Sequence, residues 1–159
     1  MTHEDLILIG RVAIAFVLSF IIGFERELRG APAGDRTFAL VGTAAAAISA
    51  VTVGPAPQAI GGVVTGVGFI GAGLVMRGDR GMLRGVTSAA AVFAVTGIGV
   101  VAGTGHLVLA AFLAALTLID LELRYIPVLR LLDARRYTAR TASDADPPIG
   151  MADEQPDTT

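Results

Sequence analysis

A long stretch without charge is the feature that most constrains what this chain can fold into. Residues 37–76 contain no Asp, Glu, Lys or Arg. As a single helix this stretch would measure roughly 60 Å, twice the hydrocarbon core of a bilayer. Its only turn signal is the sequence GPAP at 54–57, where two prolines remove backbone donors and break helical continuation. The stretch therefore predicts two membrane-spanning helices, near 37–53 and 59–76.

The second half of the chain repeats this pattern. Residues 85–119 also lack charge and are interrupted only by GTGH at 103–106, which predicts spans near 86–102 and 107–123. An apolar run at 6–24 supplies one more span. With 53% hydrophobic and 16% charged residues, the chain is too apolar for a water-soluble surface. We expect an all-α membrane protein with five transmembrane helices.

The arginines predict the orientation of these spans. All twelve basic residues are arginines, and all except Arg11 lie in alternate connections: after the first span, between the third and fourth, and after the fifth (Arg26, Arg29, Arg36; Arg77, Arg80, Arg84; Arg124, Arg130, Arg135, Arg136, Arg140). The other two connections contain none. By the positive-inside rule, the N-terminus lies outside and the C-terminus in the cytoplasm, which requires an odd number of spans.

The two ends of the chain fall outside the helical core. The first span follows Glu4 and Asp5 instead of a positive segment and shows no clear cleavage site, so we interpret it as a retained helix and not a signal peptide. Residues 126–159 are rich in Asp, Pro, Thr and Ser and predict a largely disordered cytoplasmic tail. The expected organisation is a transmembrane domain at 1–125 followed by this tail.

Two short strings in the third span and the connection after it resemble binding motifs. The GVGFIGAG sequence at 66–73 matches a dinucleotide turn, but no acidic residue follows at the required distance of roughly 20 residues. The RGD at 77–79 falls on the predicted cytoplasmic side, away from extracellular receptors. Two interpretations of the glycines stay open, close helix packing or the lining of a pathway, and both involve the same residues (Gly62, Gly66, Gly68, Gly71, Gly73, with the hydroxyls of Thr87 and Ser88).

Several motifs in one order resemble a known family. They are IGFERELRGAPAGDRT at 22–37, GVGFIGAG at 66–73, GVTSAA at 85–90 and GIG at 97–99, and over about residues 7–125 the chain is similar to the membrane domain of the MgtC/SapB family. The resemblance implies a multi-pass bacterial inner-membrane protein, active in adaptation to low magnesium and, in pathogenic members, in intracellular survival. It implies a regulator of other membrane machinery; the alternative is a small transporter or channel for magnesium or another cation.

This chain departs from the family in three ways. Longer members add a soluble cytoplasmic domain, which a tail of this length is too short to form. Phe38 stands where many members have His, and Phe93 where many have Trp. Roles that depend on that domain or on those side chains therefore do not transfer to this chain.

The loop after the first span is the candidate functional site, and its residues match the most characteristic motif of the family (Glu25, Arg26, Glu27, Asp35, Arg36, Thr37). One interpretation is an interfacial anchor in which Glu25 pairs with Arg29 at i, i+4. The other is a functional site, because charges close to hydrocarbon are costly unless they hold each other or a ligand. Glu25 and Asp35, with Glu27, would supply carboxylates for a magnesium ion; equally, the arginines would satisfy these carboxylates and leave no metal site.

Composition argues against other classes of function. There is no cysteine, no Ser, His and Asp set on a plausible shared face and no lysine, so we expect no enzyme and no resident cofactor, with magnesium the one candidate ion. The arginines serve topology and are balanced by acids, which argues against nucleic acid. The expected partners are the bilayer, further copies of the chain through Gly and Ala faces, and another inner-membrane protein. Arg11, inside the first span, is expected to reach the outer interface.

Overall fold

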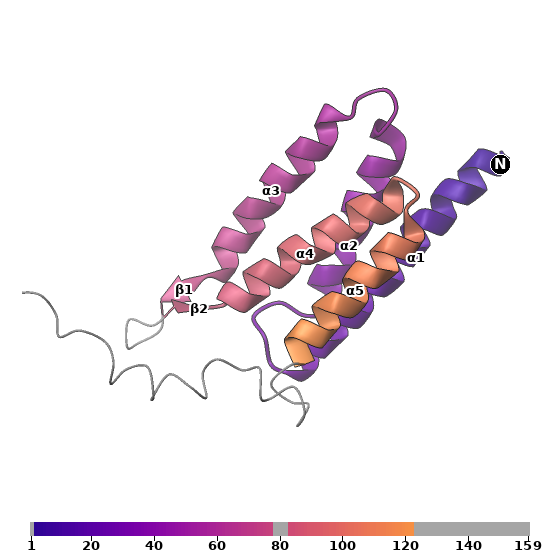
Figure 1. Ribbon diagram of the computed structural model, residues 1–159. Helices are drawn as coiled ribbons and strands as arrows, with labels where there is room; N and C mark the ends of the chain where they lie inside the picture. The colour runs from indigo at the N-terminus through magenta and orange to yellow at the C-terminus, as the bar shows by residue number, and fades with distance from the viewer. Residues whose placement is uncertain (1, 78–82, 123–159) are drawn as a thin grey trace, which may run out of the picture. The chain divides into compact units, whose positions relative to one another are not determined.

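The fold is all-helical apart from one short ribbon (Figure 1). The computed structural model describes residues 2–77 and 83–122, in which five helices follow one another: α1 (His3–Leu28), α2 (Asp35–Thr52), α3 (Gln58–Leu74), α4 (Val86–Gly103) and α5 (Leu107–Glu122). Residues 1–120 form one compact unit, and Leu121 and Glu122 belong to a second one. The five predicted helices are confirmed, whereas the predicted tail at 126–159 lies outside the described residues.

The connection between α3 and α4 differs from the sequence prediction. We expected a plain loop after a helix ending near residue 76, but the helix ends at Leu74 and an antiparallel ribbon follows, made of β1 (Met76–Arg77) and β2 (Leu83–Arg84). Gly85 links the ribbon to α4 with φ +86°, a left-handed conformation that glycine adopts without steric cost. Two residues per strand carry too little periodicity to be recognised in the sequence.

The helices differ in length and in apolar composition. Within the described part of the chain, α1 and α4 are long and apolar enough to cross a membrane, and α3 is apolar but shorter, with 17 residues. The start of α1 carries a capping box, in which Asp5 N donates to Thr2 Oγ1 and Thr2 N donates to Asp5 Oδ2. This reciprocal pair satisfies backbone donors that the first turn leaves free.

The core lies where α1, α2 and α4 meet, and glycines bring α2 and α4 together. A Cβ atom on Gly99 would collide with the carbonyl oxygen of Gly42, and one on Gly103 with that of Ala46. The two helices therefore run parallel, with a small-xxx-small pair on each, which is the usual device for close packing in lipid.

The contact between α1 and α2 is equally close. The Oγ of Ser19 occupies the space that a side chain on Gly42 would need, and a Cβ on Gly23 would lie 2.7 Å from both Asp35 Cα and Phe38 Cβ. Because later residues of α1 meet earlier residues of α2, the two helices are antiparallel. The end of α1 and the beginning of α2 thus lie at the same end of the bundle.

Helix α3 lies at the edge of this core. It packs against α4 and, less extensively, against α2, and Figure 1 shows it connected to α4 through the ribbon. Val67 is its one buried residue, and the side chain of Phe69 is 86% exposed. Most of the α3 surface is therefore left for lipid or another chain.

Candidate functional site

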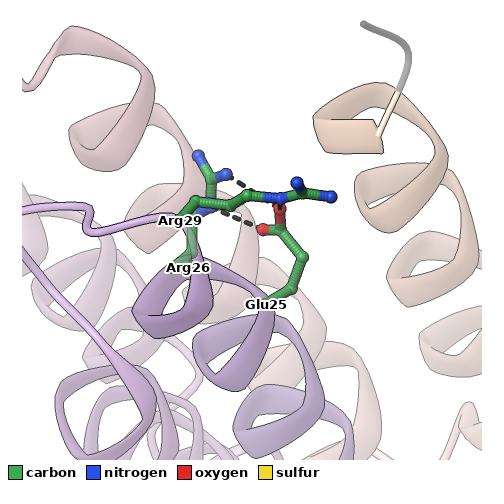
Figure 2. Close-up of polar contacts among 3 residues, drawn as sticks. All are labelled: Glu25, Arg26 and Arg29. Atoms are coloured by element: carbon green, nitrogen blue, oxygen red, sulfur yellow. Dashed lines mark hydrogen bonds and ion pairs between the residues drawn. The ribbon is translucent and has the colours of Figure 1, made fainter. Parts of the chain in front are cut away.

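The last turns of α1 hold a buried carboxylate between two arginines (Figure 2). Arg26 Nε donates to Glu25 Oε2 at 2.6 Å and Arg26 Nη2 donates to Oε1 at 2.9 Å. Arg29 Nε also donates to Oε1, at 3.3 Å. Glu25 and Arg26 are each only 8% exposed. Both carboxylate oxygens are thus engaged by guanidinium groups, and the predicted i, i+4 pair of Glu25 with Arg29 is present.

This arrangement explains how charges are tolerated next to apolar helices. A bidentate pair of Arg and carboxylate gives two charge-assisted hydrogen bonds in one plane. Such a pair compensates much of the cost of removing both groups from water, whereas Arg26 without Glu25 would be a buried unpaired charge. The burial of Glu25 and the burial of Arg26 therefore depend on each other.

The backbone after this pair forms a tight helix end. Ala31 N donates to Arg26 O and Gly30 N donates to Glu27 O, both at 3.0 Å, and Gly30 has φ +63°. These are the two bonds and the left-handed residue of a Schellman motif. Much of the characteristic loop is therefore required to end α1 and turn the chain towards α2.

The carboxylate of Glu27, from the last turn of α1, and Asp35 both lie at the beginning of α2. The carboxylate of Glu27 occupies the space next to Gly34, the N-cap residue of α2, and Asp35 Oδ1 accepts from Arg36 N at 2.6 Å. Negative charge is favourable at this end of a helix because the dipole leaves partial positive charge there. Both acids therefore stabilise the start of α2.

The structure thus divides the predicted loop residues into two groups. Glu25 and Arg26 form the buried pair. The second group lies at the beginning of α2: the carboxylate of Glu27 reaches it from the end of α1, Asp35 and exposed Arg36 begin the helix, and Thr37 is half-buried in its first turn. The part of the chain that the structure describes contains no group of three or more His, Cys, Asp or Glu residues that could hold a metal ion. A metal site at Glu25 and Asp35 stays a prediction.

The predicted glycines of α3 behave differently from those of the core. A Cβ added to Gly71 would lie 3.7 Å from Ala89 Cβ, whereas no atom of the described residues lies within 4 Å of that position for the others (Gly62, Gly66, Gly68, Gly73). Among the described residues, those four glycines are thus not packing positions, and contact with another chain stays a prediction. In α4, Thr87 is exposed and Ser88 is 3% exposed.

Sequence reasoning missed the contacts that build the core. From the sequence alone, Gly42 has no predicted role, Gly103 only a place in the turn at 103–106 and Gly99 only a place in a motif, yet all three lie at helix crossings. Their small-xxx-small spacing was a usable signal, but the same spacing in α3 is exposed. Arg11 was expected to reach the outer interface, and the structure adds a contact, because Arg11 Nη1 donates to Gly103 O at 3.3 Å.

Two apolar grooves lie on the surface. One, between α1 and α2, has a volume of about 520 Å³, and the other, between α2 and α3, about 330 Å³. Their walls are aliphatic, aromatic and alanine side chains, with Thr43 in the first and Thr96 in the second. Each threonine hydroxyl donates to a carbonyl of its own helix. The grooves thus fit lipid tails or apolar helices better than polar ligands.

These features define a class of protein: a small helical bundle with apolar helices long enough to cross a membrane and a buried ion pair at one end. The model of the MgtC family matches residues 12–126. The chain belongs to the MgtC family.

Relatives with curated names agree with this assignment. The chain is 44% identical over 97 residues to "Protein MgtC" of Salmonella typhimurium, which covers 58% of this chain and 41% of that protein. It is 35% identical over 154 residues to "Putative magnesium transporter YhiD" of Escherichia coli (strain K12), covering 89% and 70%. A Haemophilus influenzae protein is 29% identical over 134 residues, covering 76% and 56%. The chain thus spans about half the length of two of these three relatives. No solved structure matches the chain significantly.

Proposed function

We propose that this protein is a five-span inner-membrane protein that serves adaptation to low magnesium by contacting and regulating another membrane protein. Membership of the MgtC family supports the setting. The distribution of arginine supports an external N-terminus and a cytoplasmic C-terminus. No catalytic step belongs to this proposal.

The hydrogen bonds that Glu25 accepts favour a regulator over a transporter. Both of its oxygens accept hydrogen bonds from arginines. Magnesium binds proteins through one or two carboxylates and keeps several waters, so an ion arriving here would have to displace two guanidinium groups. The loop is therefore better suited to hold its own shape than to pass a cation.

The same end of the bundle offers a surface for a partner. Arg36 at the start of α2 and Arg84 just before α4 are both exposed, and the parallel packing of α2 and α4 places both at the end where α1 finishes. Two exposed arginines at one end of the bundle favour a partner with acidic loops. The apolar grooves between the helices would receive its membrane-spanning part.

Self-association is part of the proposal. Gly62, Gly66 and Gly73 fall within one face of α3 and face open space, as small-xxx-small contacts between chains require. Because the chain has no cysteine, Gly66→Cys alone would report the contact. We expect disulfide-linked dimers in membranes for this variant and none for Val108→Cys, an exposed position on α5.

The second candidate function is cation transport. The name of the Escherichia coli relative, at 35% identity, favours it. In that case Glu25 would have to exchange its arginines for the ion during transport, and the buried pair would be one state of a cycle.

Growth across a magnesium titration tests the proposal. A bacterial strain that lacks its own family member would be complemented with the wild-type chain, with Glu25→Gln and with Glu4→Gln, an exposed acid at the other end of α1. We expect rescue at low magnesium by the wild type and Glu4→Gln, and weakened rescue by Glu25→Gln at equal membrane abundance. Absence of any magnesium-dependent growth difference on deletion would contradict the proposed role.

A further inference from the structure

Arg11 lies at the end of the bundle opposite to the buried ion pair. Its Nη1 donates to the carbonyl oxygen of Gly103, the last residue of α4, at 3.3 Å. Its guanidinium group also covers Gly105, where a Cβ atom would lie 2.9 Å from Nη2. Gly105 has φ +98°, so the turn after α4 combines a left-handed residue with room for this group. Arg11 is thus fixed beside the turn and half-buried.

The guanidinium group has more donors than this contact uses. Arginine carries five N–H donors and a permanent charge. Among the described residues, Arg11 donates one hydrogen bond, to Gly103 O. An arginine charge near hydrocarbon is stable when anionic groups or water satisfy it. The remaining donors are therefore available for an acceptor with negative charge.

The length of α4 gives the depth of Arg11. Its 18 residues span about 27 Å, close to the roughly 30 Å hydrocarbon core. With exposed Arg84 at the cytoplasmic boundary, Gly103 and Arg11 reach the outer boundary, where phospholipid phosphates begin. This depth rests on the membrane orientation proposed above.

The surface around Arg11 matches an amphiphile. Ile7 and Ile14, at i−4 and i+3, share its face of α1, and they are 43% and 39% exposed. Ile14 lies on the hydrocarbon side of the charge. A molecule with an anionic head at Arg11 would therefore place its tail along Ile14.

We propose that Arg11 binds the phosphate of an outer-leaflet phospholipid, whose acyl chain lies along Ile14. The ligand is an anionic phosphodiester on a lipid, because free phosphate would gain nothing from the exposed isoleucine. The fork of the guanidinium group is suited to bidentate contact with phosphate oxygens. This binding would also hold the outer end of α1 against α4.

Native mass spectrometry of the full chain tests this site. The protein would be extracted in maltoside, which contains no phosphate, and titrated with phosphatidylglycerol. The key variant is Arg11→Gln, because it keeps a polar side chain with N–H donors while the charge is lost. We expect it to retain one lipid fewer per chain than the wild type, with at least tenfold weaker binding. Arg36→Ala, at the opposite end, is the matched control and should leave the lipid bound at the Arg11 site unaffected.

Two further measurements test the contact of the acyl chain and distinguish a lipid from free phosphate. Ile14→Asn leaves Arg11 in place and should weaken retention of the same lipid. Inorganic phosphate alone should not raise the unfolding temperature of the wild type, whereas phosphatidylglycerol should. Equal lipid retention by wild type and Arg11→Gln would overturn the proposal, as would an equal temperature shift from inorganic phosphate. Because no growth phenotype is measured, failure here leaves the proposed role in magnesium stress to its own test.

Discussion

Ser19 on α1 occupies the space in front of Gly42 on α2 that any larger residue at position 42 would need for its side chain. Ser19 is fully buried, and its Oγ has no hydrogen-bond partner among the residues that the structure describes. On its other side Gly42 presents its carbonyl oxygen to Gly99. One glycine therefore sets the distance between α2 and both of its main neighbours.

Replacing Gly42 tests this crossing directly. Gly42→Ala should destabilise the protein by about 1–3 kcal/mol, because overpacking a tight core forces neighbouring helices apart. Gly97→Ala in α4 is the matched control, since no described residue lies within 4 Å of its added Cβ; it should be neutral or stabilising by about 0.5–1 kcal/mol, the helix cost of glycine. The measurement is unfolding in detergent. Equal stability of the two variants would contradict the packing described.

The buried pair of Glu25 and Arg26 should act as a unit. Glu25→Gln leaves Arg26 without its carboxylate at a site about 8% exposed, for which we expect a loss of about 3 kcal/mol. Arg26→Gln should cost less, because Glu25 keeps its contact with Arg29. The double variant should lose less than the sum of the single variants. A double-mutant cycle of unfolding free energies measures the coupling. Additive losses would show that the two side chains do not depend on each other.

Two glycines with positive φ should differ in their tolerance of substitution. Gly30 has φ +63° and open space around it, whereas Gly85 has φ +86° and faces the carbonyl of Leu74. Gly30→Ala should cost about 1–2 kcal/mol from backbone strain, and Gly85→Ala more, since the backbone must also move. Thermal unfolding of both variants makes the comparison. A smaller effect at Gly85 would be inconsistent with the close approach of its backbone to α3.

The helices could be predicted because their causes are local. The length of the charge-free stretches indicated how many helices they contain, and the turns at 54–57 and 103–106 carry Pro and Gly signals in the sequence itself. The β-ribbon was missed because two residues per strand have no visible pattern. Pairing across five intervening residues depends on the positions of α3 and α4, which only the folded chain supplies.

The helix packing and the contacts of Glu25 could not be predicted in full from the sequence, because they depend on which side chains meet in the folded chain. The GxxxG spacing occurs both at Gly62 and Gly66 and at Gly99 and Gly103, but only the second pair lies at a helix crossing within the chain. The pairing of Glu25 with Arg29 followed from helical spacing. The bidentate contact from Arg26 did not, because neighbours at i, i+1 do not share a helix face and meet only through long side chains.

Magnesium flux into liposomes is the most direct test of the central claim that the arginines hold Glu25 as part of a regulator. Purified wild-type protein and Glu25→Gln would be reconstituted without any other protein, with a magnesium-sensitive dye inside the vesicles. We predict that neither protein admits magnesium faster than empty liposomes. Flux through the wild type that is lost in Glu25→Gln would contradict this claim and establish that carboxylate as part of a cation pathway.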